Sequence, residues 1–159
     1  MLYCVMASEY WGMVMEVLEK VGMHWSSTLI WVKDQFCLSR KDYHTRYEPI
    51  WYGWESSEAR RHPLDDRTQD DVWEFDRPRV SVEHPMMKPV ALVCRALSNS
   101  SNRGDIVVDL FGGSGTTLIA CEQTQRRCRM MELDPRYCDV IIARWEKATG
   151  RKAELMEGS

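Results

Sequence analysis

The sequence predicts an α/β fold with a mostly parallel sheet. Short apolar runs typical of strands alternate with segments whose apolar residues recur at helical spacing, and this alternation favours a parallel sheet with crossover helices. One apolar run, DIVVDL at residues 105–110, leads directly into a glycine-rich turn and then a helix. The 159 residues, 44% of them hydrophobic and 28% charged, suffice for one domain with a substantial core.

The first part of the chain is expected to supply three strands and one helix. Trp11, Val14 and Leu18 share one helical face. The segments STLIWVK and IWYGW are rich in β-branched and aromatic residues. The expected elements, in order, are a strand at residues 2–7, a helix at 10–21 closed by Gly22, and strands at 27–33 and 50–54.

Residues 55–83 differ in character from the rest. They are polar, contain the X-Pro pairs at 62–63 and 77–78, and show no sustained periodicity. This pattern predicts a long surface loop or small insertion. A role in reading nucleic acid is an alternative to a plain surface loop.

The remaining chain reads as alternating helices and strands. Pro89 is predicted to open a helix, because proline is favoured at the first helical position. The run at 105–110 is continuous, as in strands buried on both faces. The expected elements are a helix at residues 89–97, a turn at 98–104, a strand at 105–110, a helix at 116–123, a strand at 128–133 and a helix at 135–149 ended by Gly150.

Composition argues against several classes of protein. A net charge of −3 and a pI near 5.8 do not favour binding of nucleic acid by bulk electrostatics, so DNA contact requires a local patch or a partner. The six cysteines form no C-x-x-C pair, and the four histidines show no metal-ligand spacing. Without a signal-like start or a long apolar stretch, the sequence predicts a cytoplasmic protein with reduced thiols, no metal and no membrane span.

The strongest local signal is the glycine-rich segment at residues 108–117 (VDLFGGSGTT). A glycine-rich turn between a buried strand and a helix lets a ligand approach the backbone at the carboxyl end of the strand. A phosphate-binding P-loop would need a lysine after the last glycine, where Thr116 stands. The dinucleotide fingerprint is matched only in part, because Leu118 occupies the place of its third glycine.

Two carboxylates flank this turn. Asp109 ends the strand before it and can meet a cationic amino group. Glu132 lies 23 positions later, at the end of the next predicted strand, where a carboxylate can accept both hydroxyls of a ribose. A cofactor with an amino acid moiety and a ribose but no phosphate fits the pair, and S-adenosylmethionine is such a molecule.

The ordered motifs resemble a known family. Residues 109–117 (DLFGGSGTT) resemble the cofactor loop, usually D-P-F-x-G-S-G-T-T, of bacterial and phage DNA methyltransferases acting on adenine N6 or cytosine N4, with Leu110 in place of a common proline. Residues 84–89 (HPMMKP) are similar to the H-P-T-x-K-P element that precedes this loop in the permuted, beta-type subgroup. Residues 127–137, 144–150 and 43–54 resemble further stretches of that family, with Tyr47 in place of a histidine.

The resemblance implies a Rossmann-like S-adenosylmethionine-dependent methyltransferase fold acting on double-stranded DNA, with adenine N6 favoured over cytosine N4. It also implies three regions: residues 1–54 on the substrate side of the sheet, 55–83 as the variable loop, and 84–159 as the cofactor-binding part. Glu132 would hold the ribose, with Asp134 close by. The residues implied at the methionine end are Lys88, Pro89, Asp109, Phe111, Gly112, Gly113, Ser114, Gly115 and Thr116.

The family's catalytic tetrad, (D/N/S)-P-P-(Y/F/W), has no counterpart in these residues, so no catalytic residue is identified and the fold is expected to be incomplete. Residues 134–137 (DPRY) have Arg136 where the second proline should stand, and we interpret them as a helix cap. Without the tetrad strand, one edge of the strand at 105–110 should lack a partner. The alternatives are an enzyme completed by an upstream segment or a second chain, an inactive cofactor- or DNA-binding remnant, and, more weakly, a nicotinamide-dependent oxidoreductase.

Overall fold

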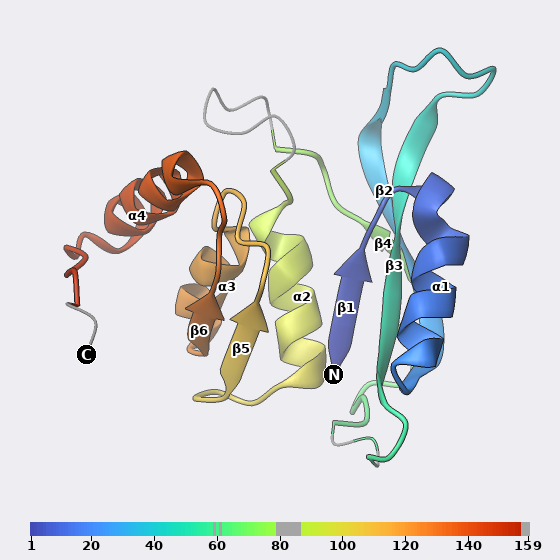
Figure 1. Ribbon diagram of the computed structural model, residues 1–159, viewed down its shortest axis with the longest axis horizontal. Helices are drawn as coiled ribbons and strands as arrows, with labels where there is room; N and C mark the ends of the chain where they lie inside the picture. Colours follow the sequence, from blue (N-terminus) through green and yellow to red (C-terminus); the bar gives the residue numbers. More distant parts are fainter. Residues whose placement is uncertain (59, 61, 79–86, 157–159) are drawn as a thin grey trace. The chain divides into compact units, whose positions relative to one another are not determined.

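The protein, seen here as a computed structural model, forms two compact units, Met1–Arg77 and Pro78–Ser159 (Figure 1). The structure describes residues 1–58, 60, 62–78 and 87–156. Within the first unit, the elements are β1 (Leu2–Val5), the 3-10 turn η1 (Ser8–Tyr10), α1 (Trp11–Lys20), β2 (Met23–Cys37), β3 (Thr45–Glu55) and β4 (Val72–Glu74). The second unit contains α2 (Val90–Ser100), β5 (Ile106–Asp109), α3 (Thr116–Thr124), β6 (Arg127–Met130) and α4 (Pro135–Thr149).

The sheet of the first unit has the order β1-β3-β2-β4. The β1–β3 and β2–β3 pairs are antiparallel, and only β4 runs parallel to its neighbour β2. The expectation of a mostly parallel sheet is therefore wrong for this unit, because β2 and β3 are joined as a hairpin rather than through a crossover helix. Its core gathers large side chains from three strands: Leu29, Trp31, Ile50, Trp51, Tyr52 and Trp73.

Pro49 lies inside the central strand β3, where proline is rarely accepted because it cannot donate to the ladder. The register explains this position. The Pro49 carbonyl accepts from the Met6 backbone amide at 3.4 Å, so the missing N–H would point to the same side of the strand. On that side the β1 ladder ends with the Val5–Ile50 pair. The proline therefore takes no hydrogen bond from the ladder with β2, and the only bond it leaves unmade is the reciprocal one to the Met6 carbonyl, at the end of the β1 ladder.

In the second unit, β5 and β6 form a parallel pair in which Ile106 is opposite Arg127 and Asp109 is opposite Met130. One face of this two-stranded sheet packs on α2 and α3 through an apolar cluster that contains Leu97, Ala120 and Cys121. Figure 1 shows these two helices alongside the β5–β6 pair.

The expected burial of the 105–110 strand on both faces is wrong. Ile106 and Val108 are 54% and 62% exposed, because no described element of this unit covers their face. Among the described residues, β5 pairs only with β6.

Element boundaries shift from the expected ones where pairing, rather than local composition, decides them. The predicted strands at 27–33 and 50–54 extend to 23–37 and 45–55, because the hairpin partners support each other well beyond the apolar runs. The segment predicted as a loop contributes β4 to the first unit. The division at 54/55 and 83/84 into functional regions stays a prediction.

Candidate functional site: the glycine loop after β5

The loop between β5 and α3 takes its shape from its glycines. Gly113 and Gly115 have φ angles of 54° and 78°, in the left-handed region that other residues seldom adopt. Gly115 is the N-cap of α3, and its carbonyl accepts from the Ile119 amide at 3.2 Å. These positive φ values turn the chain from the strand end into the helix within a few residues.

Two glycines also permit close packing beneath the loop. A Cβ on Gly112 would lie 2.8 Å from Cγ and Sδ of Met130, and one on Gly115 would lie 3.0 Å from Cγ2 of Ile141. Met130 ends β6, and Ile141 is a buried residue of α4. The loop therefore rests directly on β6 and α4.

Glu132 is tied to the loop by its carboxylate. Oε2 accepts from the Gly113 amide at 2.6 Å, and Oε1 accepts from the Asp134 amide at 3.0 Å. These two backbone hydrogen bonds, that from Asp134 first, hold the pKa of the carboxyl below its usual range. The group is therefore ionised at neutral pH. A carboxylate has about four lone-pair sites, so both oxygens keep acceptor capacity for a ligand.

Asp109 lies on the neighbouring strand and helps to order the start of the loop. Its Oδ1 accepts from the Phe111 amide at 3.0 Å, and its carbonyl accepts from the Met131 amide at 2.9 Å. The Gly112 amide in turn donates to the Met131 carbonyl at 2.8 Å. The structure thus places Asp109 and Glu132 at the adjacent carboxyl ends of β5 and β6.

Two hydroxyls connect the loop to the start of α2. Ser114 Oγ and Thr116 Oγ1, both buried, lie 3.3 Å apart, and Thr116 Oγ1 donates to the Lys88 carbonyl at 3.4 Å. The Lys88–Pro89 pair is therefore brought to the glycine loop. Pro89 is the N-cap of α2 rather than its first helical residue, which corrects the expected helix start. The rest of the motif, residues 84–86, lies outside the described residues.

Exposed apolar side chains flank the two carboxylates. Phe111 is 87% exposed and Leu133 is 98% exposed, and Leu110 and Met131 also present more than half of their surface. Large apolar residues so close to charged groups are typical of ligand sites, which combine apolar lining with a few polar groups.

The segment at residues 134–137 is a helix cap, as interpreted from the sequence. Asp134 is the N-cap of α4 and accepts from the Arg136 amide at 2.9 Å, while Pro135 follows in the first turn. The guanidinium of Arg136 also lies 2.8 Å from the other carboxylate oxygen. The Arg136 side chain, followed by its backbone amide, lowers the pKa of the Asp134 carboxyl.

Two residues of α4 that support the loop, Ile141 and Arg144, were not among the site residues expected from the sequence. Arg144 Nη1 donates to the Ser114 carbonyl inside the loop. Ile141 fills the space under Gly112 and Gly115. The available signal was the arginine itself, because a charged residue within an otherwise apolar helical face requires a buried acceptor.

Within the described ranges, no group of three or more histidine, cysteine, aspartate or glutamate side chains is placed to hold a metal ion. Among the helices of the part of the chain that the structure describes, none has the length and apolar character of a membrane span.

Comparison with known proteins bears on both units. The DNA methylase (N6/N4) family model matches residues 3–144. Type II methyltransferase M.HpaI of Haemophilus parainfluenzae is 26% identical over 164 residues, covering 90% of this chain and 52% of its own length. DNA adenine methyltransferase YhdJ of Escherichia coli K12 is 37% identical over 87 residues, covering 52% of this chain and 30% of its own.

A solved structure supports the same relationship at the level of fold. The crystal structure of the M1.HpyAVI–SAM complex aligns with a TM-score of 0.76 and 22% identity, over 90% of this chain and 72% of that one. The α/β methyltransferase fold expected from the sequence is thereby confirmed. The chain spans about half or less of the length of the curated relatives it matches. Because the family model matches most of its residues, the chain belongs to the DNA methylase (N6/N4) family.

Proposed function

We propose that this chain is the S-adenosylmethionine-binding part of a site-specific DNA methyltransferase that acts on an exocyclic amino group, with adenine N6 favoured over cytosine N4. The observation that carries the proposal is the link between the glycine loop and Glu132, made by the Gly113 amide at 2.6 Å. It keeps an ionised carboxylate beside a loop whose backbone a ligand can approach closely. Its family relatives include an adenine methyltransferase, which supports the choice of base.

The residues present fit the cofactor. Glu132 would accept from the ribose hydroxyls, Asp109 would pair with the amino group of the methionine moiety, and Lys88 would pair with its carboxylate. Leu133, next to Glu132, would lose exposed apolar surface when the adenine ring covers it, and Phe111 would do so at the methionine end. S-adenosylmethionine supplies an electrophilic methyl group. The remaining loop residues would contribute shape and backbone contacts: Pro89, Gly112, Gly113, Ser114, Gly115 and Thr116, with Asp134 beside Glu132.

Transfer to a base amino group requires further residues. The nitrogen lone pair is delocalised into the ring, so oxygen atoms must accept hydrogen bonds from the amino group to make the nitrogen nucleophilic. An aromatic ring must also stack on the flipped base. The family's tetrad supplies both. We infer that residues outside these 159, in an upstream segment or a second chain, carry the tetrad and pair with the open edge of β5. Among the described residues the second edge of β5 has no partner strand, which supports completion of the sheet in this way.

A second candidate is a remnant that binds the cofactor or DNA without catalysis. The β5 edge without a partner strand among the described residues favours it equally, because a sheet that is never completed would show the same edge. The two candidates share the cofactor site and differ only in methyl transfer.

Calorimetric titration tests the cofactor site directly. We expect the folded chain to bind S-adenosylmethionine and its demethylated product but not NADH or ATP. Glu132→Ala should weaken binding at least about tenfold, since hydrogen bonds to a charged acceptor contribute about 1.5–3 kcal/mol each. Glu154→Ala, at an exposed position beyond α4, is the matched control. Absence of binding to folded protein would reject the proposal.

Methyl transfer then separates the two candidates. Labelled S-adenosylmethionine and mixed-sequence duplex DNA are incubated with the chain alone and with a polypeptide that carries D-P-P-Y. Label on DNA only in the second mixture would support an enzyme completed from outside these residues. Cofactor binding with no label in either would favour the remnant. Nucleoside analysis of labelled DNA identifies the base.

A further inference from the structure

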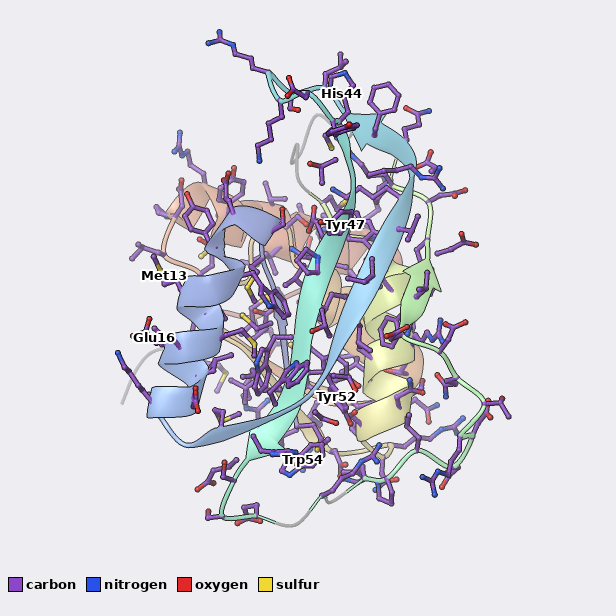
Figure 2. All side chains as sticks on the ribbon, turned by 90° about the vertical axis from the view of Figure 1, so that its right-hand side faces the viewer. Met13, Glu16, His44, Tyr47, Tyr52 and Trp54 are labelled. Atoms are coloured by element: carbon purple, nitrogen blue, oxygen red, sulfur yellow. The ribbon has the colours of Figure 1, made fainter. Side chains whose placement is uncertain are left out.

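We propose that the hairpin tip, defined as residues Phe36–Tyr47 where β2 turns into β3, is a DNA-contacting element. The inference rests on the proposed function in taking DNA as the partner. Figure 2 shows the tip at the opposite end of the hairpin from Trp54, with His44 in the turn and Tyr47 lower on β3. In this view the tip extends past the end of α1 in the same unit.

Large apolar and aromatic side chains are concentrated on the hairpin tip. Leu38 and Tyr43 are 84% and 88% exposed, and Phe36 and Tyr47 are 54% and 41% exposed. The same hairpin buries Trp31 and Trp51 almost completely nearer its middle. Side chains this exposed contribute little to the core, and a cluster of them marks an interaction site.

The charge of the tip is opposite to that of the whole chain. The tip contains three basic residues, Arg40, Lys41 and Arg46, and one acidic residue, Asp42. Its net charge is therefore +2, in a chain of net charge −3. Lys41 lies 3.5 Å from Glu9, but both side chains are more than half exposed, so the pair holds Lys41 only weakly. A local basic patch is what DNA contact requires in an acidic protein.

The tip is held on an ordered base. Lys33 and Glu48 form an ion pair of 2.6 Å across β2 and β3, with Lys33 buried. Arg46 Nε donates to the Lys33 carbonyl at 3.0 Å. Within the tip, the rings of Phe36 and His44 stack at 5.0 Å with an interplanar angle of 12°. The exposed side chains are therefore presented by a defined structure, which lowers the entropic cost of binding.

This combination suits DNA chemically. A two-stranded ribbon fits the major groove, where side chains reach the base edges. Arginine and lysine neutralise phosphates, while aromatic and aliphatic side chains contact bases or wedge between base steps. Arg40 and Lys41 would make the phosphate contacts, and Leu38 and Tyr43 the base contacts.

Fluorescence anisotropy with a labelled duplex of mixed sequence, repeated at several salt concentrations, tests this assignment on the full chain. In Arg40→Ser/Lys41→Ser, the slope of log association constant against log salt should fall by about 1.8, or about 0.9 for each lost phosphate contact. Tyr43→Ser should weaken binding about five- to a hundredfold with little change in slope. The matched control is Met13→Ser/Lys20→Ser, which removes one exposed apolar and one exposed basic side chain from α1 and should bind like the parent chain.

Each result has a defined meaning. Tip variants that retain cofactor affinity and bind duplex as the parent does would overturn the assignment while leaving the proposed function standing. Unchanged DNA binding with a loss of self-association in sedimentation would assign the tip to contact between copies instead. A parent chain that binds cofactor but no duplex at any salt concentration would reject both the tip and the DNA-binding part of the proposed function.

Discussion

Replacing Gly115 with alanine should destabilise the protein more than the same change at Gly104. Both residues have left-handed φ angles, 78° and 85°, and alanine there costs about 1–2 kcal/mol. A Cβ at Gly115 would lie 3.0 and 3.1 Å from Cγ2 and Cγ1 of Ile141, whereas one at Gly104 meets nothing within 4 Å. Because Ile141 is only 9% exposed and cannot withdraw freely, overpacking adds about 1–3 kcal/mol.

Urea denaturation of the two variants measures this difference. We expect a loss in unfolding free energy of about 1–2 kcal/mol for Gly104→Ala and about 2–5 kcal/mol for Gly115→Ala, the sum of the two costs. In the Ile141→Ala background, which removes both clashing carbons, the Gly115 penalty should approach that of Gly104. Equal losses for the two single variants would refute the close packing of the loop on α4.

Three further predictions concern ionised groups. Because the folded-state pKa of Glu132 is lowered, its contribution to stability is present above the ordinary glutamate pKa and is lost as pH falls below about 4.5. The unfolding free energy should therefore decline less steeply between pH 7 and 3 in Glu132→Gln than in the parent chain. Parallel declines in the two proteins would contradict this. Lys33→Met should lower the unfolding free energy by about 3–5 kcal/mol, because it leaves Glu48 without its partner. In urea denaturation, the double variant Lys33→Met/Glu48→Leu should recover much of this loss. A double variant as unstable as Lys33→Met would argue against the ion pair as the cause. Asp134→Ala should lower the unfolding free energy by about 1 kcal/mol, because it removes the side chain that caps α4, while Asp134→Asn should lower it little. Equal changes in melting temperature for the two variants would contradict the capping role.

Local chemistry was sufficient where a short segment dictates its own geometry. The cap at residues 134–137 and α4 from Pro135 to Thr149 were predicted with the observed bounds, because Asp-Pro at the start and Gly150 at the end act within one helical turn. The glycine loop was predicted for the same reason, since strand, turn and helix are consecutive in the chain. Its carboxylates at 109 and 132 could be paired from the alternation of strands alone.

Long-range pairing was harder to predict. β4 has three residues in a polar segment and is a strand only because it lies beside β2, where Trp73 becomes 97% buried. The Val72–Trp73 pair in otherwise polar surroundings was the available signal. The antiparallel order of the first sheet likewise depends on a hairpin whose strands continue beyond their apolar runs.

The amino-acid order by itself determined the family, the glycine turn and the two acidic positions beside it, because these depend on neighbours in the chain. Only the tertiary structure decided that Glu132 holds the Gly113 amide, that Ile141 and Arg144 support the loop from α4, and that one face of β5 has no described element over it. The physical reason is distance along the chain. Contacts between Ser114 and Arg144, 30 residues apart, form only when helices and strands pack, and no local propensity encodes that meeting.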